Sequence, residues 1–329
     1  MENNRSYRKI SEKADIQAAM ALFNSCADNG EVLYKRFDTE TAFERFFLHR
    51  EDGVRTISIV ESQYGGFASG CLNEQGTKGY VTFVAVQPER RRQGVGRELL
   101  HTLEEQLRAM AGEKLESFEA SFFNPMNFVW IVPGTDGHEH PNAPGVDVAG
   151  SGYLFLKNCG YRDFAYQNSY HLNLQGYQMT EDVARKEETL QEKGIQITYY
   201  DSEKHTGLEE TLVNLNNDMW YKEIMAVAAK KDGPPLLIVD WNGKAMGFTG
   251  PLYVRENGRG YLAGVGIHSD CRGNGAGKVL FGRLCTGLRD LGAKYMTLFT
   301  GETNPARNIY EAQGFKIVRT WADMHKQAK

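Results

Sequence analysis

At 329 residues, the chain is long enough for two domains of ordinary size, each with its own core. Its composition is globular, 41% hydrophobic and 24% charged, and a net charge of −4 gives no general attraction to nucleic acid or to an anionic membrane. The five cysteines stand singly, no stretch approaches 18 apolar residues, and residues 1–6 lack the apolar core of a secretory signal. We therefore expect a cytoplasmic protein, a monomer or homodimer, without nucleic-acid or membrane partners.

The first half of the chain predicts strands and helices around one glycine-rich turn. Strands are expected at residues 7–10, 55–60, 66–72 and 115–122, helices at 12–23 and 39–48, and a polar loop at 24–29. The alternating strand 79–86 leads into the turn Arg91-Arg92-Gln93-Gly94-Val95-Gly96. After this turn, Leu99, Leu103, Leu107 and Met110 form one apolar stripe along a helix.

The second half predicts a similar order of elements. A charged connector helix is expected at 177–194, followed by strands at 195–200, 236–240 and 245–252 and helices at 202–214 and 218–230. The strand 261–268 leads into the turn Arg272-Gly273-Asn274-Gly275-Ala276-Gly277. Leu280, Leu284, Leu288 and Leu291 then form the stripe of the next helix, and a strand is expected at 295–300.

The order strand, glycine turn, helix indicates an anion site, because free backbone N–H groups and the positive end of the helix dipole meet there. A P-loop requires Gly-Lys followed by Ser or Thr, but Val279 follows Lys278. The dinucleotide fingerprint requires a third glycine where Lys278 stands. The remaining pattern is Arg-x-x-Gly-x-Gly directly after a strand.

The two turns belong to an internal repeat. Gly275 lies 181 positions after Gly94, and the same offset places Gly260-Tyr261 on Gly79-Tyr80. Both copies close with a glycine and an aromatic residue, Gly160-Tyr161 and Gly314-Phe315. A repeat that matches in strand, turn, helix and closing pair indicates two copies of one fold.

On these motifs the chain resembles two tandem GNAT-type N-acetyltransferases, an arrangement similar to the mycothiol-synthase type, although no acceptor-specific motif is matched. The resemblance implies two α/β folds with mixed sheets, an N-terminal domain at 1–176 and a C-terminal domain at 195–329. In this family the turn holds the diphosphate of acetyl-CoA, and the strand before it contacts the thioester arm through its main chain. The implied acetyl-CoA-binding residues are Val265, Gly266, Ile267, Arg272, Gly273, Asn274, Gly275, Ala276 and Gly277, and in the first copy Val84, Ala85, Val86, Arg91, Arg92, Gln93, Gly94, Val95 and Gly96.

The resemblance also implies catalytic candidates in the second copy. The family commonly places a tyrosine four residues before the Gly-aromatic pair, which is Tyr310 here, and a phenol can protonate the departing thiolate. The general base is left open between Glu302 and His268, which both fall near the expected thioester. The first copy has Leu156 at the tyrosine position and so lacks this acid.

The first copy carries 27 more residues than the second between its turn and its closing glycine, most of them in the loop 124–150. Its acidic and histidine residues are Asp136, His138, Glu139, His140 and Asp147. Because they lack the helical HExxH spacing and a further ligand from elsewhere, no metal is predicted. We expect this loop to form a polar wall over a ligand pocket or an interdomain contact.

These features predict an N-acetyltransferase that moves the acetyl group of acetyl-CoA to the primary amine of a small molecule, mainly in the C-terminal copy. Two alternatives remain. Catalysis could lie in the first copy, whose turn is the better family match, or the protein could be a CoA-binding regulatory module without turnover.

Overall fold

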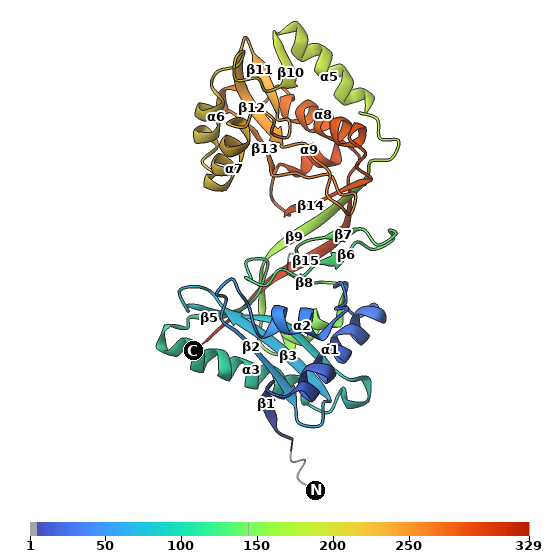
Figure 1. Cartoon of the computed structure of the whole chain (residues 1–329), viewed down its shortest axis with the longest axis vertical. Coiled ribbons are helices and arrows are strands. Elements are labelled where there is room, and N and C mark those ends of the chain that lie inside the picture. The colour runs from blue at the N-terminus through green and yellow to red at the C-terminus, as the bar shows by residue number, and fades with distance from the viewer. Residues whose placement is uncertain (1–4, 144, 329) are drawn as a thin grey trace. The chain divides into compact units, whose positions relative to one another are not determined.

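The computed structural model describes residues 5–143 and 145–328. Met1–Asn4, Pro144 and Lys329 lie outside the described residues, and the first of these belong to the segment 1–6 in which no secretory signal is expected. The chain divides into two compact units (Figure 1). The N-terminal unit comprises Met1–Asn168 with Arg319–Lys329, and the C-terminal unit comprises Ser169–Val318. The predicted mixed α/β class is confirmed, because β4 pairs antiparallel with β3 and parallel with β5.

The N-terminal unit contains these elements: β1 (Tyr7–Lys9), α1 (Lys13–Asp28), α2 (Glu40–Phe47), β2 (Thr56–Glu61), β3 (Gly66–Leu72), β4 (Lys78–Val86), η1 (Pro88–Arg90), α3 (Val95–Ala111), η2 (Gly112–Lys114), β5 (Ser117–Ala120), β6 (Trp130–Ile131), β7 (Glu139–His140), β8 (Val146–Asp147), α4 (Ser151–Asn158) and the first part of β9 (Arg162–Asn173). Its sheet has the order β1-β2-β3-β4-β5-β15-β9. The strand β15 (Lys316–Gln327) enters this sheet with its later residues, opposite β5 from Ser117 to Ala120.

Two apolar clusters cover the two faces of this sheet. The stripe Leu99, Leu103 and Leu107 of α3 has no exposed surface and packs against one face, as its helical spacing predicts. Phe23 of α1 and Phe43 of α2 are equally buried in the cluster on the other face. The sheet is therefore enclosed by helices on both sides (Figure 1).

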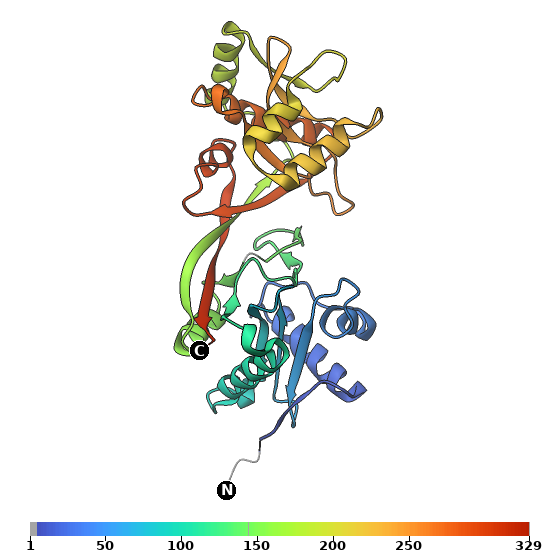
Figure 2. The same cartoon turned by 90° about the vertical axis from the view of Figure 1, so that its left-hand side faces the viewer.

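The C-terminal unit contains α5 (Glu181–Glu192), β10 (Ile195–Tyr199), α6 (Leu208–Leu215), α7 (Asp218–Ala228), β11 (Leu237–Trp241), β12 (Lys244–Gly250), β13 (Gly264–Ile267), η3 (Ser269–Cys271), α8 (Ala276–Asp290), β14 (Tyr295–Gly301), α9 (Arg307–Glu311) and the start of β15. The strands β10-β11-β12-β13 form one sheet, and β14 lies beside the end of β9. Helices α6 and α7 cover one face of the sheet, and α5, α8 and α9 belong to the cluster on the other (Figure 2).

The predicted repeat extends to the pairing of the strands. Gly66 of β3 lies opposite Val86 of β4, and Gly247 of β12 lies opposite Ile267 of β13, in each case 181 positions later. One copy has an irregularity that the other lacks. Thr82 is an extra residue in β4, because Phe83 pairs with Ser69 and Val81 with Gly70, whereas the pairing of β13 with β12 runs without a shift.

The two compact units differ from the boundaries expected at 1–176, 177–194 and 195–329. Strands β9 and β15 each begin in one unit and end in the other, so the last residues of the chain belong to the N-terminal unit. The expected connector helix is the first helix of the C-terminal unit, because Val183 and Leu190 of α5 are buried in its core.

Four local predictions differ from the structure. The helix expected at 202–214 begins only at Leu208, because residues 202–207 form a turn and an isolated bridge before α6. The loop expected at 24–29 is helical through Asp28, because the amide of Asn24 bonds both the N–H and the carbonyl of Phe37 and so satisfies a buried polar side chain. Leu291 follows the last turn of α8 and is exposed, outside the apolar stripe. The strand expected at 261–268 is regular only over β13. No helix among the described residues has the length and apolar character to cross a membrane.

Candidate functional site

The N-terminal glycine turn presents a row of backbone N–H groups at the start of α3. Arg92 and Gly94 have φ angles of 62° and 89°, and Gly94 immediately precedes the helix. Within the described residues, the amides of Gln93, Gly94, Val95 and Gly96 have no backbone acceptor. This arrangement is an anion nest of the kind that binds a diphosphate.

The C-terminal turn has the same conformation. Gly273 and Gly275 have φ angles of 84° and 90°, and α8 begins directly after Gly275. The side chain of Asn274 accepts a bond of 3.0 Å from the amide of Ala276, while the amides of Gly275 and Gly277 meet no backbone acceptor in the described part of the chain. Both predicted glycine turns therefore form, and their binding of a diphosphate stays a prediction.

One arginine fixes each turn to the strand before it. Arg91 Nε donates to the carbonyl of Val86 at 2.9 Å, and Arg272 Nε donates to the carbonyl of Ile267 at 2.9 Å. A second cation borders each turn: Arg5 bonds the carbonyl of Gln93 at 2.7 Å, and the Lys186 side chain would lie 3.3 Å from a Cβ placed on Gly275. Positive charge beside free amides favours a bound anion.

In each unit, the strand that leads into the glycine turn separates from the parallel strand beside it. In the N-terminal unit, β4 and β5 pair in parallel only from Lys78 to Tyr80 and then separate. In the C-terminal unit, the amide of Gly260 donates to the carbonyl of Tyr295 at 2.8 Å, where the two strands meet. The predicted strand-end residues Val84, Ala85 and Val86, and Val265, Gly266 and Ile267, follow these points of divergence.

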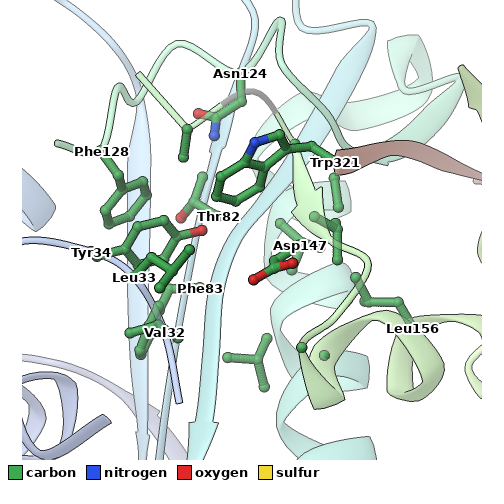
Figure 3. Close-up of a pocket in the computed structure, with 18 of the residues that line it drawn as sticks. Val32, Leu33, Tyr34, Thr82, Phe83, Asn124, Phe128, Asp147, Leu156 and Trp321 are labelled. Carbon is green, nitrogen blue, oxygen red and sulfur yellow. The ribbon is translucent and has the colours of Figure 1, made fainter. Parts of the chain in front are cut away.

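A cavity of about 140 Å³ occupies the divergence in the N-terminal unit (Figure 3). Its walls include β4 at Val81–Val84, the chain from Ala120 to Phe128, residues 31–34, the loop residues Ala143, Gly145–Asp147 and Gly150, and Gly152 and Leu156 of α4. Trp321 of β15 closes one side and is 1% exposed. The loop therefore lines a pocket, in agreement with the wall expected from the sequence.

Two carboxylates line this cavity. Glu31 forms a two-point pair with Arg91, at 2.8 and 2.7 Å, and this guanidinium lowers the pKa of Glu31. Asp147 Oδ1 accepts the amide of Ala149 at 2.9 Å, and its Oδ2 lies 3.6 Å from Arg319 Nε.

Hydroxyl groups complete the polar part of the cavity. Thr82, the bulged residue of β4, donates to the carbonyl of Ser69 at 2.8 Å. Burial, with a smaller contribution from the charge of Asp147, raises the pKa of Tyr34 to about 12, so its phenol stays protonated near neutral pH. In Figure 3 the side chains of Tyr34, Thr82 and Asp147 point into the same space beside Trp321.

Tyr310, the predicted acid of the C-terminal unit, lies in α9 against the aromatic core. It is 9% exposed, and its ring centroid is 5.0 Å from that of Phe281. Burial raises its pKa to about 12. Leu156, at the equivalent position of the first copy, lines the N-terminal cavity.

The two predicted bases lie on either side of the C-terminal turn in sequence and differ in their surroundings. His268 is buried, and its Nδ1 accepts the amide of Asp270 at 3.2 Å, so it caps η3. Glu302 is exposed, and its carbonyl accepts from Arg307 at 2.8 Å. Among the described residues, no hydrogen bond or ion pair joins Tyr310, His268 and Glu302.

A larger hollow in the C-terminal unit lies elsewhere. It measures about 890 Å³, is lined by residues such as Tyr200, Lys230 and Pro235, and includes none of the predicted site residues. Across residues 5–143 and 145–328, no three histidine, cysteine, aspartate or glutamate side chains are placed to hold a metal ion.

Sequence reasoning assigns no role to Tyr34, Thr82, Asp147 or Trp321. Asp147 belongs to the acidic and histidine-rich loop, which is the one signal that points toward it. The position of Trp321 carries no such signal, because it stands in the sequence of the second copy and folds into the first.

Comparison with known proteins gives a consistent result. The family model described as "Acetyltransferase (GNAT) family" matches residues 17–124 and 198–315. No curated protein matches the sequence.

Three solved structures are similar at 15% identity. A glucosamine N-acetyltransferase region of a fungal multi-domain GH3 beta-N-acetylglucosaminidase has a TM-score of 0.62 and covers 98% of this chain, which spans 38% of that one. A GCN5-related N-acetyltransferase from Sphaerobacter thermophilus has a TM-score of 0.61, with coverage of 100% and 97%. A tandem GNAT protein from the clavulanic acid biosynthesis pathway has a TM-score of 0.56, with coverage of 99% of both chains. At this identity the likeness shows the tandem fold.

Proposed function

Because the chain belongs to the acetyltransferase (GNAT) family and is therefore an N-acetyltransferase, we propose that it transfers the acetyl group of acetyl-CoA to the primary amine of a small molecule. The observation that carries this proposal is the cavity where β4 and β5 diverge. Its volume of about 140 Å³ fits a compact acceptor, and the predicted diphosphate turn follows β4 after the short helix η1.

The reaction forms a bond between the amine nitrogen and the acetyl carbonyl carbon and breaks the carbon–sulfur bond. The ammonium ion gives up two protons, of which one ends on the sulfur of CoA and the other in solvent. The amides of residues 93–96 would hold the diphosphate, and the main chain of Val84–Val86 would contact the thioester arm.

Two locations for the chemistry are proposed. The sequence favours the C-terminal unit with Tyr310 as the acid, and its raised pKa leaves the phenol with a proton to give. Of the two bases, Glu302 is the better candidate, because a neutral His268 whose Nδ1 accepts a hydrogen bond carries its proton on Nε2. The geometry favours the alternative, the N-terminal unit, since its cavity joins a carboxylate to protonated hydroxyl groups.

A matched pair of turn variants distinguishes these locations. Gly94→Ala and Gly275→Ala each place a Cβ at a left-handed residue, which costs about 1–2 kcal/mol and displaces the turn. Thiol release from acetyl-CoA is measured with glucosamine, phenethylamine, putrescine and phenylalanine; glucosamine is included because of the fungal region named above.

We expect Gly94→Ala to lower kcat/KM for acetyl-CoA about tenfold, while Gly275→Ala and Tyr310→Phe change it less than about twofold. The reverse pattern assigns catalysis to the C-terminal unit. If none of the amines causes thiol release but calorimetry detects binding of acetyl-CoA, the regulatory module is favoured. A wild-type protein that neither turns over an amine nor binds acetyl-CoA contradicts the proposal.

We also propose a cytoplasmic location. All five cysteines are free thiols, and four of them are buried, which suits a reducing compartment. The expected monomer or homodimer stays a prediction that light scattering in solution tests.

A further inference from the structure

We infer that Asp147 binds the ammonium group of the acceptor in the N-terminal cavity and restricts acceptors to compact amines with a net positive charge. This inference rests on the proposed function, because it names the substrate class of that site. It assigns a specific role to the extra loop of the first copy.

The charge of the cavity wall is the first observation. Among the described residues, the lining contains two carboxylates, Glu31 and Asp147, and no lysine, arginine or histidine. Both oxygens of Glu31 are already bonded to Arg91. Asp147 is therefore the carboxylate that remains for a ligand.

The second observation is how Asp147 is held. It lies in β8, opposite Trp321 of β15, and the amide of Ala149 fixes its Oδ1. Arg319 Nε, at 3.6 Å from Oδ2, is close enough for an ion pair and too distant for a hydrogen bond. The Oδ2 atom thus keeps acceptor capacity, and Figure 3 shows the carboxylate facing the cavity.

Aromatic side chains form much of the apolar wall of the cavity. The rings of Tyr34 and Phe128 stack with centroids 4.5 Å apart, and both line the cavity together with Trp321. The faces of aromatic rings attract cations. A cationic amine would therefore meet one carboxylate and apolar, cation-tolerant walls.

The same arrangement rejects two classes of molecule. An amino acid would bring a carboxylate into a wall whose formal charges are negative, and like charges repel there strongly because little water separates them. A neutral alcohol of the same shape would displace water from Asp147 without bringing a positive charge in its place. The cavity therefore selects acceptors by their charge more than by their shape.

The test uses the full-length protein, phenethylamine, its neutral isostere phenethyl alcohol, and phenylalanine. Asp147→Asn keeps the Oδ1 acceptor for Ala149 and removes the charge. Asp136→Asn is the matched control, because Asp136 lies exposed in the same loop and does not line the cavity. Affinity for the probes is measured by calorimetry without acetyl-CoA, turnover by thiol release, and folding by thermal unfolding.

We expect Asp147→Asn to weaken the binding of phenethylamine and raise its KM about 10- to 100-fold, the range for a lost charged hydrogen bond, while the KM for acetyl-CoA changes less than about twofold. Asp136→Asn should behave as wild type. Neither phenethyl alcohol nor phenylalanine should compete with phenethylamine for the wild-type protein. Because this comparison uses the wild type, it tests the inference even if Asp147→Asn does not fold.

The outcomes separate this inference from the proposed function. Amine binding that depends on Asp147, without turnover, supports the inference and counts against the proposed reaction. Turnover that Asp147→Asn leaves unchanged overturns the inference and leaves the reaction standing. Equal binding of amine and alcohol, or no binding of the amine, also overturns it.

Discussion

The N-terminal unit depends on the last strand of the chain, so Trp321→Ala is expected to destabilise that unit selectively. Trp321 is 1% exposed, and its ring centroid lies 5.1 Å from that of Trp130 in an edge contact. A buried tryptophan removes about 150–250 Å² from water, worth about 4–6 kcal/mol at 25 cal/mol per Å², and large-to-small changes of this kind cost about 3–5 kcal/mol. A loss of about 4 kcal/mol lowers Tm by about 8–16 °C in a unit of this size.

The assay is differential scanning calorimetry with hydrogen exchange followed by mass spectrometry. Exchange protection should fall in β2–β5 and remain in β10–β13. Ile317→Ala is the control, because Ile317 lies in the same strand, belongs to the C-terminal unit and is 44% exposed; a surface change of this kind costs about 0.5 kcal/mol or less. Equal loss of protection in both units, or a Tm change no larger than that of the control, would refute the reasoning.

Three further predictions concern stability. Arg91 lowers the pKa of Glu31, so this carboxylate contributes stability above about pH 4 that is lost as the pH falls through its folded pKa. Glu31→Gln should therefore flatten the acid side of the curve of Tm against pH. An unchanged slope contradicts this prediction. Burial raises the pKa of Asp323, so the native state binds this proton more tightly than the unfolded state and the wild type gains stability on acidification. Asp323→Asn should therefore raise Tm most near neutral pH, measured against wild type from pH 4 to 8, and a uniform or negative shift is the contrary result. Gly264→Ala would place a Cβ 2.4 Å from the rigid Trp220 ring and should cost the C-terminal unit about 1–3 kcal/mol; loss of exchange protection in the N-terminal unit instead would contradict the contact.

The parts of the fold that the sequence predicts are those encoded by local pattern. Leu99, Leu103 and Leu107 recur at helical spacing, and all three are fully buried. The two turns are predictable because Gly94 and Gly275 stand where the chain turns left-handed, which glycine adopts without the cost that a Cβ imposes. The constant offset of the repeat then extends the prediction from single elements to the pairing of the strands.

The exchange of strands could not be predicted in this way. A β-strand alternates its side chains regardless of which strand it pairs with, so β15 has the same pattern beside a strand of its own copy or of the other. The lining of the N-terminal cavity by Trp321 follows from that exchange. Likewise, the role of Asp147 depends on β8 pairing with β15, a contact between residues far apart in the sequence.

The two copies keep the same glycine turn and differ where an acceptor would meet the thioester. The chemistry of the two regions explains why one is kept and the other varies. Holding a diphosphate requires backbone conformation alone, whereas choosing and positioning an amine requires particular side chains. At the offset of the repeat, the bulged Thr82 becomes Ala263, whose carbonyl accepts the indole N–H of Trp220 at 3.0 Å. A chain of this kind is expected to bind acetyl-CoA at two turns and an amine at one site. Calorimetry that finds two acetyl-CoA sites and one amine site per chain, with the amine site lost in Asp147→Asn, would therefore support the N-terminal location without any measurement of turnover.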